Sequence, residues 1–272
     1  MTWTIHLNGM YSILQYRGAI TNPTALTTDI VDTIGFLDLP THILGRQSKT
    51  LNIWHDFCRG KDGVEPVSGL PFGVLDLFSM IAQPDIELQF WTWTGAGIEA
   101  KPVQRRAWDA IRFAGIISAR EQHRDQMPIQ PSPSSPGCPP TVTLVQAIVD
   151  CLNDFLATPR EEACSVLNLY LYPVFIAGTQ YNILSSAQKA CIERFWKEFL
   201  LDPEGEGAVN RSGEAGGRTV SDGQAGGDAG PEGVGSPYVE APLDILHELW
   251  TNSNRRTSDQ IAREWGLEVG LF

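Results

Sequence analysis

The sequence has no closely spaced cysteine pair, little positive charge and no long hydrophobic run. Its five cysteines include no Cys-x-x-Cys pair, which structural zinc sites commonly use to bring two thiolates to one ion. We therefore predict no metal site and no cofactor in this chain. Lys and Arg number 20 against 32 Asp and Glu, which gives a net charge of −12. Such a surface repels phosphates, so direct binding of nucleic acid or of an anionic membrane is not expected.

No segment is apolar over the length that a bilayer requires. The longest nearly apolar stretch covers 166–178, which is 13 residues, whereas a transmembrane helix needs about 20. The residues after Met1 show neither the basic start nor the apolar segment of a secretory signal. We therefore expect an intracellular protein without membrane association.

Two segments have compositions that disfavour regular structure. The segment 127–140 contains six prolines in fourteen residues, whose fixed φ angles and missing N–H groups exclude a continuous helix. The segment 203–237 contains eleven glycines in thirty-five residues and almost no large apolar side chain, so burial cannot offset its ordering entropy. We predict a flexible linker at 127–140 and a disordered insertion at 203–237 within one domain spanning 1–272.

Elsewhere the apolar residues recur mostly at helical spacing. Leu144, Ile148, Leu152 and Phe155 share one helix face, which must be buried. The stretch 87–94 has the best strand-like alternation, and we interpret it as helix or irregular. The sequence therefore predicts an all-α fold, a multi-helix bundle of stacked helical hairpins. Further helices are expected at 5–17, 26–38, 42–58, 70–82, 101–124 and 241–252.

Three capping boxes mark expected helix starts. Thr158, Ser185 and Thr257 each precede a Glu or Gln by three residues. In this arrangement the hydroxyl accepts a hydrogen bond from a free backbone N–H of the first turn, and the Glu or Gln side chain returns one to the cap. We expect a helix to begin directly after each of them.

Two sets of side chains admit both a functional and a structural interpretation. The basic residues of 101–124 could contact nucleic acid, but Asp109 is spaced to pair with Arg105 and Arg112, which favours a solvated helix face. Six tryptophans could wall a ligand cavity, although we prefer core packing for them. These tryptophans are Trp54, Trp91, Trp93, Trp108, Trp196 and Trp250.

One segment resembles the signature of a known family. Residues 171–178, Leu-Tyr-Pro-Val-Phe-Ile-Ala-Gly, resemble the Trp-Pro-Leu-Phe-Ile-Ala-Gly motif of the fungal-specific transcription factor domain, the helical regulatory region of zinc binuclear cluster regulators. Three further segments are similar to that family in the same order: 3–14, 67–81, and 246–250 with Trp265. There are departures, because Tyr172 stands where the family has tryptophan, Val174 replaces leucine, and Thr179-Gln180 replaces Cys-Glu.

The resemblance implies a function. It implies a nuclear domain that modulates transcription by RNA polymerase II in response to a small-molecule effector or a protein partner, such as a full-length zinc-cluster regulator. It also implies no enzymatic activity. The zinc ions of the family belong to a cysteine-rich DNA-binding module that this sequence does not contain. The family-motif residues present here are Tyr172, Pro173, Phe175, Ile176, Ala177, Gly178 and Trp250.

The chemistry of the motif indicates an architectural role without reference to the family. Pro173 within an apolar helix removes one backbone hydrogen bond and bends the helix, and burial of Phe175 and Ile176 would stabilise the fold by roughly 1.5–3 kcal/mol each. Two other functions stay open. One is a helical enzyme acting on an apolar metabolite, and the other is a pure protein-interaction scaffold.

Overall fold

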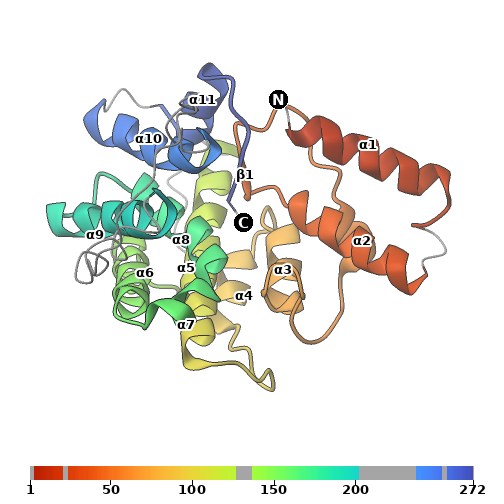
Figure 1. Ribbon diagram of the computed structural model, residues 1–272, viewed down its shortest axis with the longest axis horizontal. Coiled ribbons are helices and arrows are strands. Elements are labelled where there is room, and N and C mark those ends of the chain that lie inside the picture. The colour runs from red at the N-terminus through yellow and green to blue at the C-terminus, as the bar shows by residue number, and fades with distance from the viewer. Residues whose placement is uncertain (1–2, 21–23, 127–136, 202–236, 253–255, 272) are drawn as a thin grey trace, which may run out of the picture.

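The centre of the molecule is a long helix surrounded by shorter ones. The computed structural model describes residues 3–20, 24–126, 137–201, 237–252 and 256–271. Helix α5 (Pro102–Gln126) packs against α4 (Ile86–Thr92), α6 (Thr141–Leu156) and α8 (Leu167–Thr179) (Figure 1). The structure is mostly helical with extensive helix–helix packing, as the sequence predicts.

The remaining helices form two groups around this centre. At one side lie α1 (Trp3–Tyr16) and α2 (Ala25–Leu37), with α3 (Phe72–Ser79) between them and α4 (Figure 1). At the other side lie α9 (Ser186–Trp196), α10 (Pro237–Thr251) and α11 (Ser258–Glu264) (Figure 1). The short elements are α7 (Arg160–Cys164) and the two π-helical turns η1 (Trp54–Cys58) and η2 (Lys197–Leu201).

Helix α6 is amphipathic in the way that the periodicity predicts. Leu144, Ile148, Leu152 and Phe155 are all buried, each with at most 1% of its surface exposed. The stretch 87–94, interpreted as helix or irregular, contains most of α4. The predicted helices at 5–17, 26–38, 70–82, 101–124 and 241–252 correspond to α1, α2, α3, α5 and α10.

Two of the three capping boxes form. Ser185 accepts from the backbone N–H of Gln188 and begins α9, and Thr257 does the same with Gln260 for α11. The prediction of a capping box at Thr158 is wrong, because the Thr158 hydroxyl donates a hydrogen bond to the carbonyl of Asp154 at 2.8 Å and does not cap the next helix. Helix α7 therefore begins without a side-chain cap.

The predicted helix at 42–58 is wrong over most of its length. Ile43–Leu44 form strand β1, which pairs antiparallel with β2 (Val269–Gly270), and only the turn η1 is helical. Gly45 has a φ of +68°, and a Cβ there would lie 2.1 Å from the carbonyl oxygen of Leu267. A right-handed helix cannot pass through this position, since the chain makes a left-handed turn under the C-terminal segment.

A buried carboxylate joins the two ends of the described chain. Glu268 accepts hydrogen bonds from the backbone N–H of Thr4 at 2.8 Å, from the Thr4 hydroxyl at 2.7 Å and from the backbone N–H of Gln47 at 2.8 Å. These three hydrogen bonds replace those that the carboxylate would form with water if it were exposed. This contact and the β1–β2 pair fix the C-terminal segment across the segment 43–50.

The predicted linker and the predicted insertion lie mostly outside the described residues. Of 127–140 the structure describes 137–140, which lead directly into α6. Of 203–237 it describes only the first residue of α10. The prediction of a disordered insertion therefore stays a prediction.

Candidate functional site

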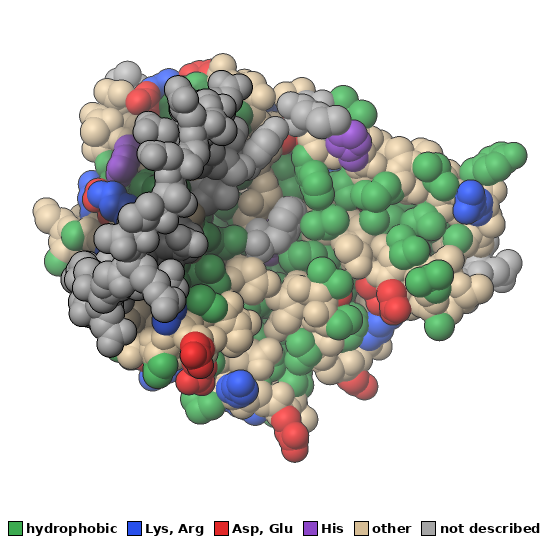
Figure 2. Space-filling view, in the orientation of Figure 1, with side chains coloured by type: hydrophobic (Ala, Val, Ile, Leu, Met, Phe, Trp, Pro, Cys, Tyr) green, Lys and Arg blue, Asp and Glu red, His purple; other side chains and the backbone are tan. Residues whose placement is uncertain are grey.

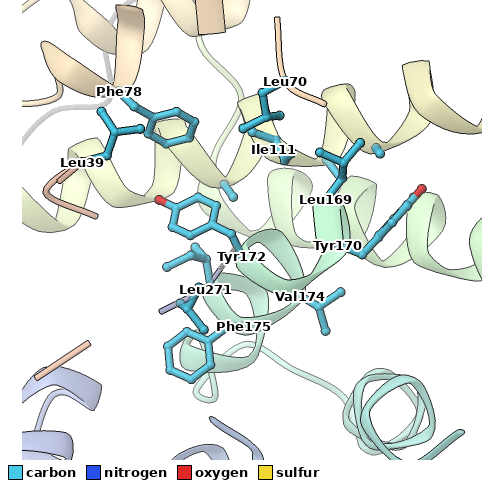
Figure 3. Close-up of a cluster of buried hydrophobic side chains, with 14 of the residues drawn as sticks. Leu39, Leu70, Phe78, Ile111, Leu169, Tyr170, Tyr172, Val174, Phe175 and Leu271 are labelled. Carbon is cyan, nitrogen blue, oxygen red and sulfur yellow. The ribbon is translucent and has the colours of Figure 1, made fainter. Parts of the chain in front are cut away.

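The segment that resembles the family motif, 171–178, forms the C-terminal part of helix α8. Residues 172–178 are buried, including Tyr172 at 2% exposure and Phe175 at 0%. Figure 3 shows Tyr172, Val174 and Phe175 among core residues of several elements. Pro173 lies inside this helix, where its ring replaces the N–H that would otherwise donate to the carbonyl of Leu169. The motif is therefore placed in the core of the molecule.

Helix α10 packs closely on the last turn of α8. A Cβ at Gly178 would lie 2.8 Å from both methyl carbons of Leu246, so this contact leaves no room for a larger residue. The indole N–H of Trp250 donates to the carbonyl of Gly178 at 3.0 Å. The structure thus brings together two of the motif residues, Gly178 and Trp250, that lie far apart in the sequence.

This close contact gives a stability prediction. Gly178→Ala should lower the free energy of unfolding by about 1–3 kcal/mol, because the new methyl group overlaps Leu246 and forces a shift. Urea unfolding would measure the loss. The control is Leu246→Ala, which is costly alone because it opens a cavity. In the double variant the two losses should be less than additive, and additive losses would contradict the proposed overlap.

Tyr172, which stands in place of the family's tryptophan, carries a buried hydroxyl. This hydroxyl lies 2.7 Å from that of Ser118 on α5, and the Tyr172 ring stacks on His42 with 4.4 Å between ring centres. The hydroxyl of Thr41 lies 3.1 Å from Nδ1 of His42. Burial raises the pKa of Tyr172, against a smaller lowering by its hydrogen bonds to Ser118 and Thr41. The phenol is therefore neutral and acts as a hydrogen-bonding group.

A cleft opens beside this group of polar side chains. It has a volume of about 910 Å³ and lies between the end of α8, the C-terminal half of α5, the segment 40–50 and the C-terminal helices. Thr41 and Ser118 line it, so the hydrogen-bond network of Tyr172 reaches its wall. Ile176, Thr179 and Gln180 at the end of the motif helix also line it.

The cleft wall is rich in charged and polar groups. Lys49 and Arg124 are exposed, and within the described ranges neither has an acidic partner. Gln180 donates to the carboxylate of Glu121 at 2.6 Å, which orients both side chains. This is a contact between a neutral amide and a carboxylate at the edge of the cleft.

Other cations of the cleft are neutralised by acids. Arg46 pairs with the buried Asp38, whose carboxylate also accepts from the backbone N–H groups of Leu51 and Ile53. Burial raises the pKa of Asp38, and its hydrogen bonds and Arg46 lower it by less. Arg263 pairs with Asp259 at 2.5 Å. The cleft can therefore bind a small polar molecule through hydrogen bonds and two uncompensated cations, Lys49 and Arg124.

Sequence reasoning did not find this cleft. Thr41, Ser118 and Gln180 come from segments more than fifty residues apart, and no local motif connects them. The one local signal was the run Gly45 to Thr50, which is glycine-containing and polar in the manner of a loop.

The basic helix is solvated as predicted at four of its six cations, and only Arg112 and Arg120 are partly buried. Asp109 pairs with Arg112 at 3.0 Å as expected, but Arg105 donates to the carbonyl of Ile98 instead. Arg120 is only 13% exposed and forms an ion pair with the buried Glu87 at 2.9 Å. Between Arg112 and Arg120 this side of α5 is therefore packed against α4 and the residue that follows it.

The tryptophans lie mainly in the core. Trp54, Trp108 and Trp196 are at most 2% exposed, and Trp91, Trp93 and Trp250 pack against the core from its edge. The described residues that line the cleft include no tryptophan. The tryptophans therefore do not form the walls of this cleft, as they would in the interpretation of the chain as an enzyme acting on an apolar metabolite.

Within the described parts of the chain, no three His, Cys, Asp or Glu side chains gather in a way that could hold a metal ion. The same parts contain no helix with the length and apolar character needed to cross a membrane. Comparison of the chain with protein-family models, with curated proteins and with solved structures finds no match.

Proposed function

We propose that the chain is the helical regulatory region of a fungal transcription factor of the zinc-cluster type, acting in the nucleus without catalysis of its own. The observation that carries the proposal is the placement of residues 171–178. They form a buried, proline-containing helix whose last turn borders a polar cleft. A motif in this position couples the packing of the core to whatever occupies the cleft.

In this proposal the cleft holds a small polar effector. An effector regulates only if it binds one conformation of the domain more tightly than another. Binding in the cleft would reach α8 through Thr179 and the adjoining Gln180, and α5 through Ser118, because these three residues line the cleft. The zinc of such a regulator belongs to a separate DNA-binding module, supplied by a longer form of the protein or by a partner regulator.

A tethered reporter assay tests this function. The chain, fused to a heterologous DNA-binding domain in fungal cells, should change transcription of the reporter relative to the DNA-binding domain alone. The double variant Lys49→Glu/Arg124→Glu removes both uncompensated cations of the cleft and should reduce this change toward that of the DNA-binding domain alone.

The matched control is Lys101→Glu/Arg59→Glu, which makes the same change of charge at exposed positions outside the cleft. It should leave the reporter response intact. A fused chain without effect on the reporter would contradict the regulatory function. Turnover of a metabolite by the purified protein would favour the enzyme instead.

A further inference from the structure

Helix α1 is packed on one side only. It extends along the edge of the molecule beside α2 (Figure 1) and buries Leu7 and Leu14. Its opposite side exposes Ile5 at 64%, Ile13 at 57% and Tyr16 at 94%. A surface helix normally carries polar side chains on its outer face, so this face has the composition of an interface.

The apolar surface continues onto α2. Leu26 is 71% exposed and Ile30 is 40% exposed, and Met10 on α1 is 38% exposed. Figure 2 shows hydrophobic side chains gathered over α1 and α2. We call these six residues, Ile5, Met10, Ile13, Tyr16, Leu26 and Ile30, the arm surface.

The area of the arm surface matches one half of a stable interface. At roughly 200 Å² for a fully exposed side chain of this size, the six residues expose on the order of 700 Å². A standard protein–protein interface buries about 800 Å² on each partner. A second copy that offered the same surface would therefore supply the other half.

The lack of charge on α1, the part of the arm surface that carries Ile5, Met10, Ile13 and Tyr16, favours a second copy over a charged partner. Helix α1 contains no Asp, Glu, Lys or Arg, although the chain has a net charge of −12. Two copies of an acidic protein repel each other least where they carry the least charge. A strongly charged partner finds no opposite charge on α1.

Gly9 lies at the middle of this exposed face. Ile5, Gly9, Ile13 and Tyr16 follow one another at four- and three-residue spacing, so they share one side of the helix. A Cβ on Gly9 would meet nothing within 4 Å, so packing inside the chain does not require glycine here. Glycine in a helix interior is unfavourable unless another backbone comes close. In a two-fold pairing of α1 helices, the helix midpoints are the point of closest approach.

We propose that the chain forms a two-fold symmetric dimer through the arm surface, with the two α1 helices crossing at Gly9. Two-fold dimers are the commonest soluble assemblies, and in each the same patch contacts itself. This inference does not depend on the proposed regulatory function, because it uses only residues of α1 and α2.

Sedimentation equilibrium of the full chain tests the dimer. The wild-type protein should sediment with twice the 29.9 kDa of one chain at micromolar concentration. Ile5→Glu/Ile13→Glu should raise the dissociation constant at least about 100-fold, because four charges would enter an apolar contact. The matched control Leu88→Glu/Val142→Glu alters residues of 43% and 54% exposure outside the arm and should leave the dimer intact.

Gly9→Leu tests the crossing point separately. This variant adds a side chain where the chain itself has free space, so far-ultraviolet circular dichroism should show an unchanged or higher helical content. The dimer should nevertheless weaken at least tenfold. A wild-type monomer at 100-micromolar concentration would overturn the dimer, and so would a dimer insensitive to Ile5→Glu/Ile13→Glu. A dimer insensitive to Gly9→Leu would overturn the crossing at Gly9.

Discussion

Glu87→Leu should lower the free energy of unfolding by about 3–5 kcal/mol, the usual cost of removing one partner of a buried ion pair. Glu87 is 2% exposed and accepts from Nε of Arg120 at 2.9 Å. The guanidinium also donates to the hydroxyl of Thr141 and to the carbonyl of Pro139, so one side chain joins α4, α5 and the start of α6. Without Glu87 this partly buried cation keeps only neutral acceptors.

Urea unfolding of a double-mutant cycle would measure the effect. Glu87→Leu/Arg120→Leu removes both charges, so it should cost less than the sum of the single variants. Glu198→Leu is the matched control, since the pair of Arg194 and Glu198 is exposed and its loss should cost no more than about 1 kcal/mol. Equal losses for Glu87→Leu and Glu198→Leu would contradict the structural role of the buried pair.

The ion pair also shows why two cations of the basic helix, Arg112 and Arg120, are less exposed than the other four. In the sequence, Arg112 and Arg120 belong to a series of cations at helical spacing, which indicates a solvated face. Their acceptors, the carbonyls of Trp91 and Trp93 and the carboxylate of Glu87, lie about twenty to thirty residues earlier on α4 or just after it. Helical periodicity cannot reveal such partners.

Local signals succeeded where the local environment alone decides the structure. The boxes at Ser185 and Thr257 need only four consecutive residues, and both form. Thr158 has the same pattern, but it lies close behind α6 and its hydroxyl is used by the carbonyl of Asp154. A preceding helix that ends nearby therefore competes with the cap.

Long-range contacts explain the error at 42–58. Ile43, Leu44, Ile53 and Trp54 are all buried, so the apolar spacing was a true sign of burial. Leu44, however, lies in a strand and pairs with Val269 in β2, which is more than two hundred residues away in the sequence. The cleft depends on the same rearrangement, because the segment that replaces the start of the expected helix supplies Arg46, Ser48 and Lys49 to its wall.

The stability of the fold should fall on acidification because of His42. Burial lowers the pKa of this imidazole from 6.5 to about 3, and the rings of Phe36, Phe78 and Tyr172 surround it. Above pH 6.5 the imidazole is neutral in both the folded and the unfolded states. Between pH 6.5 and 3 only the unfolded chain takes up the proton, so the folded state loses about 1.4 kcal/mol per pH unit. At pH 4.5 the loss reaches about 2.5–3 kcal/mol relative to pH 7.

Comparison with His42→Gln isolates this effect from other titrating groups. The pKa of Asp38 is raised by burial, so its protonation on acidification favours the folded state and acts in the opposite direction. Both proteins contain Asp38, and the difference between their unfolding free energies removes its contribution.

Urea unfolding at pH 7 and at pH 4.5 should therefore show a smaller loss for His42→Gln by about 2.5–3 kcal/mol. His123→Gln makes the same substitution at a partly exposed histidine and serves as the matched control for the change of residue type. Parallel pH profiles for the wild type and His42→Gln would mean that water or a proton reaches the imidazole in the folded state, and the stacked arrangement with Tyr172 would then be wrong.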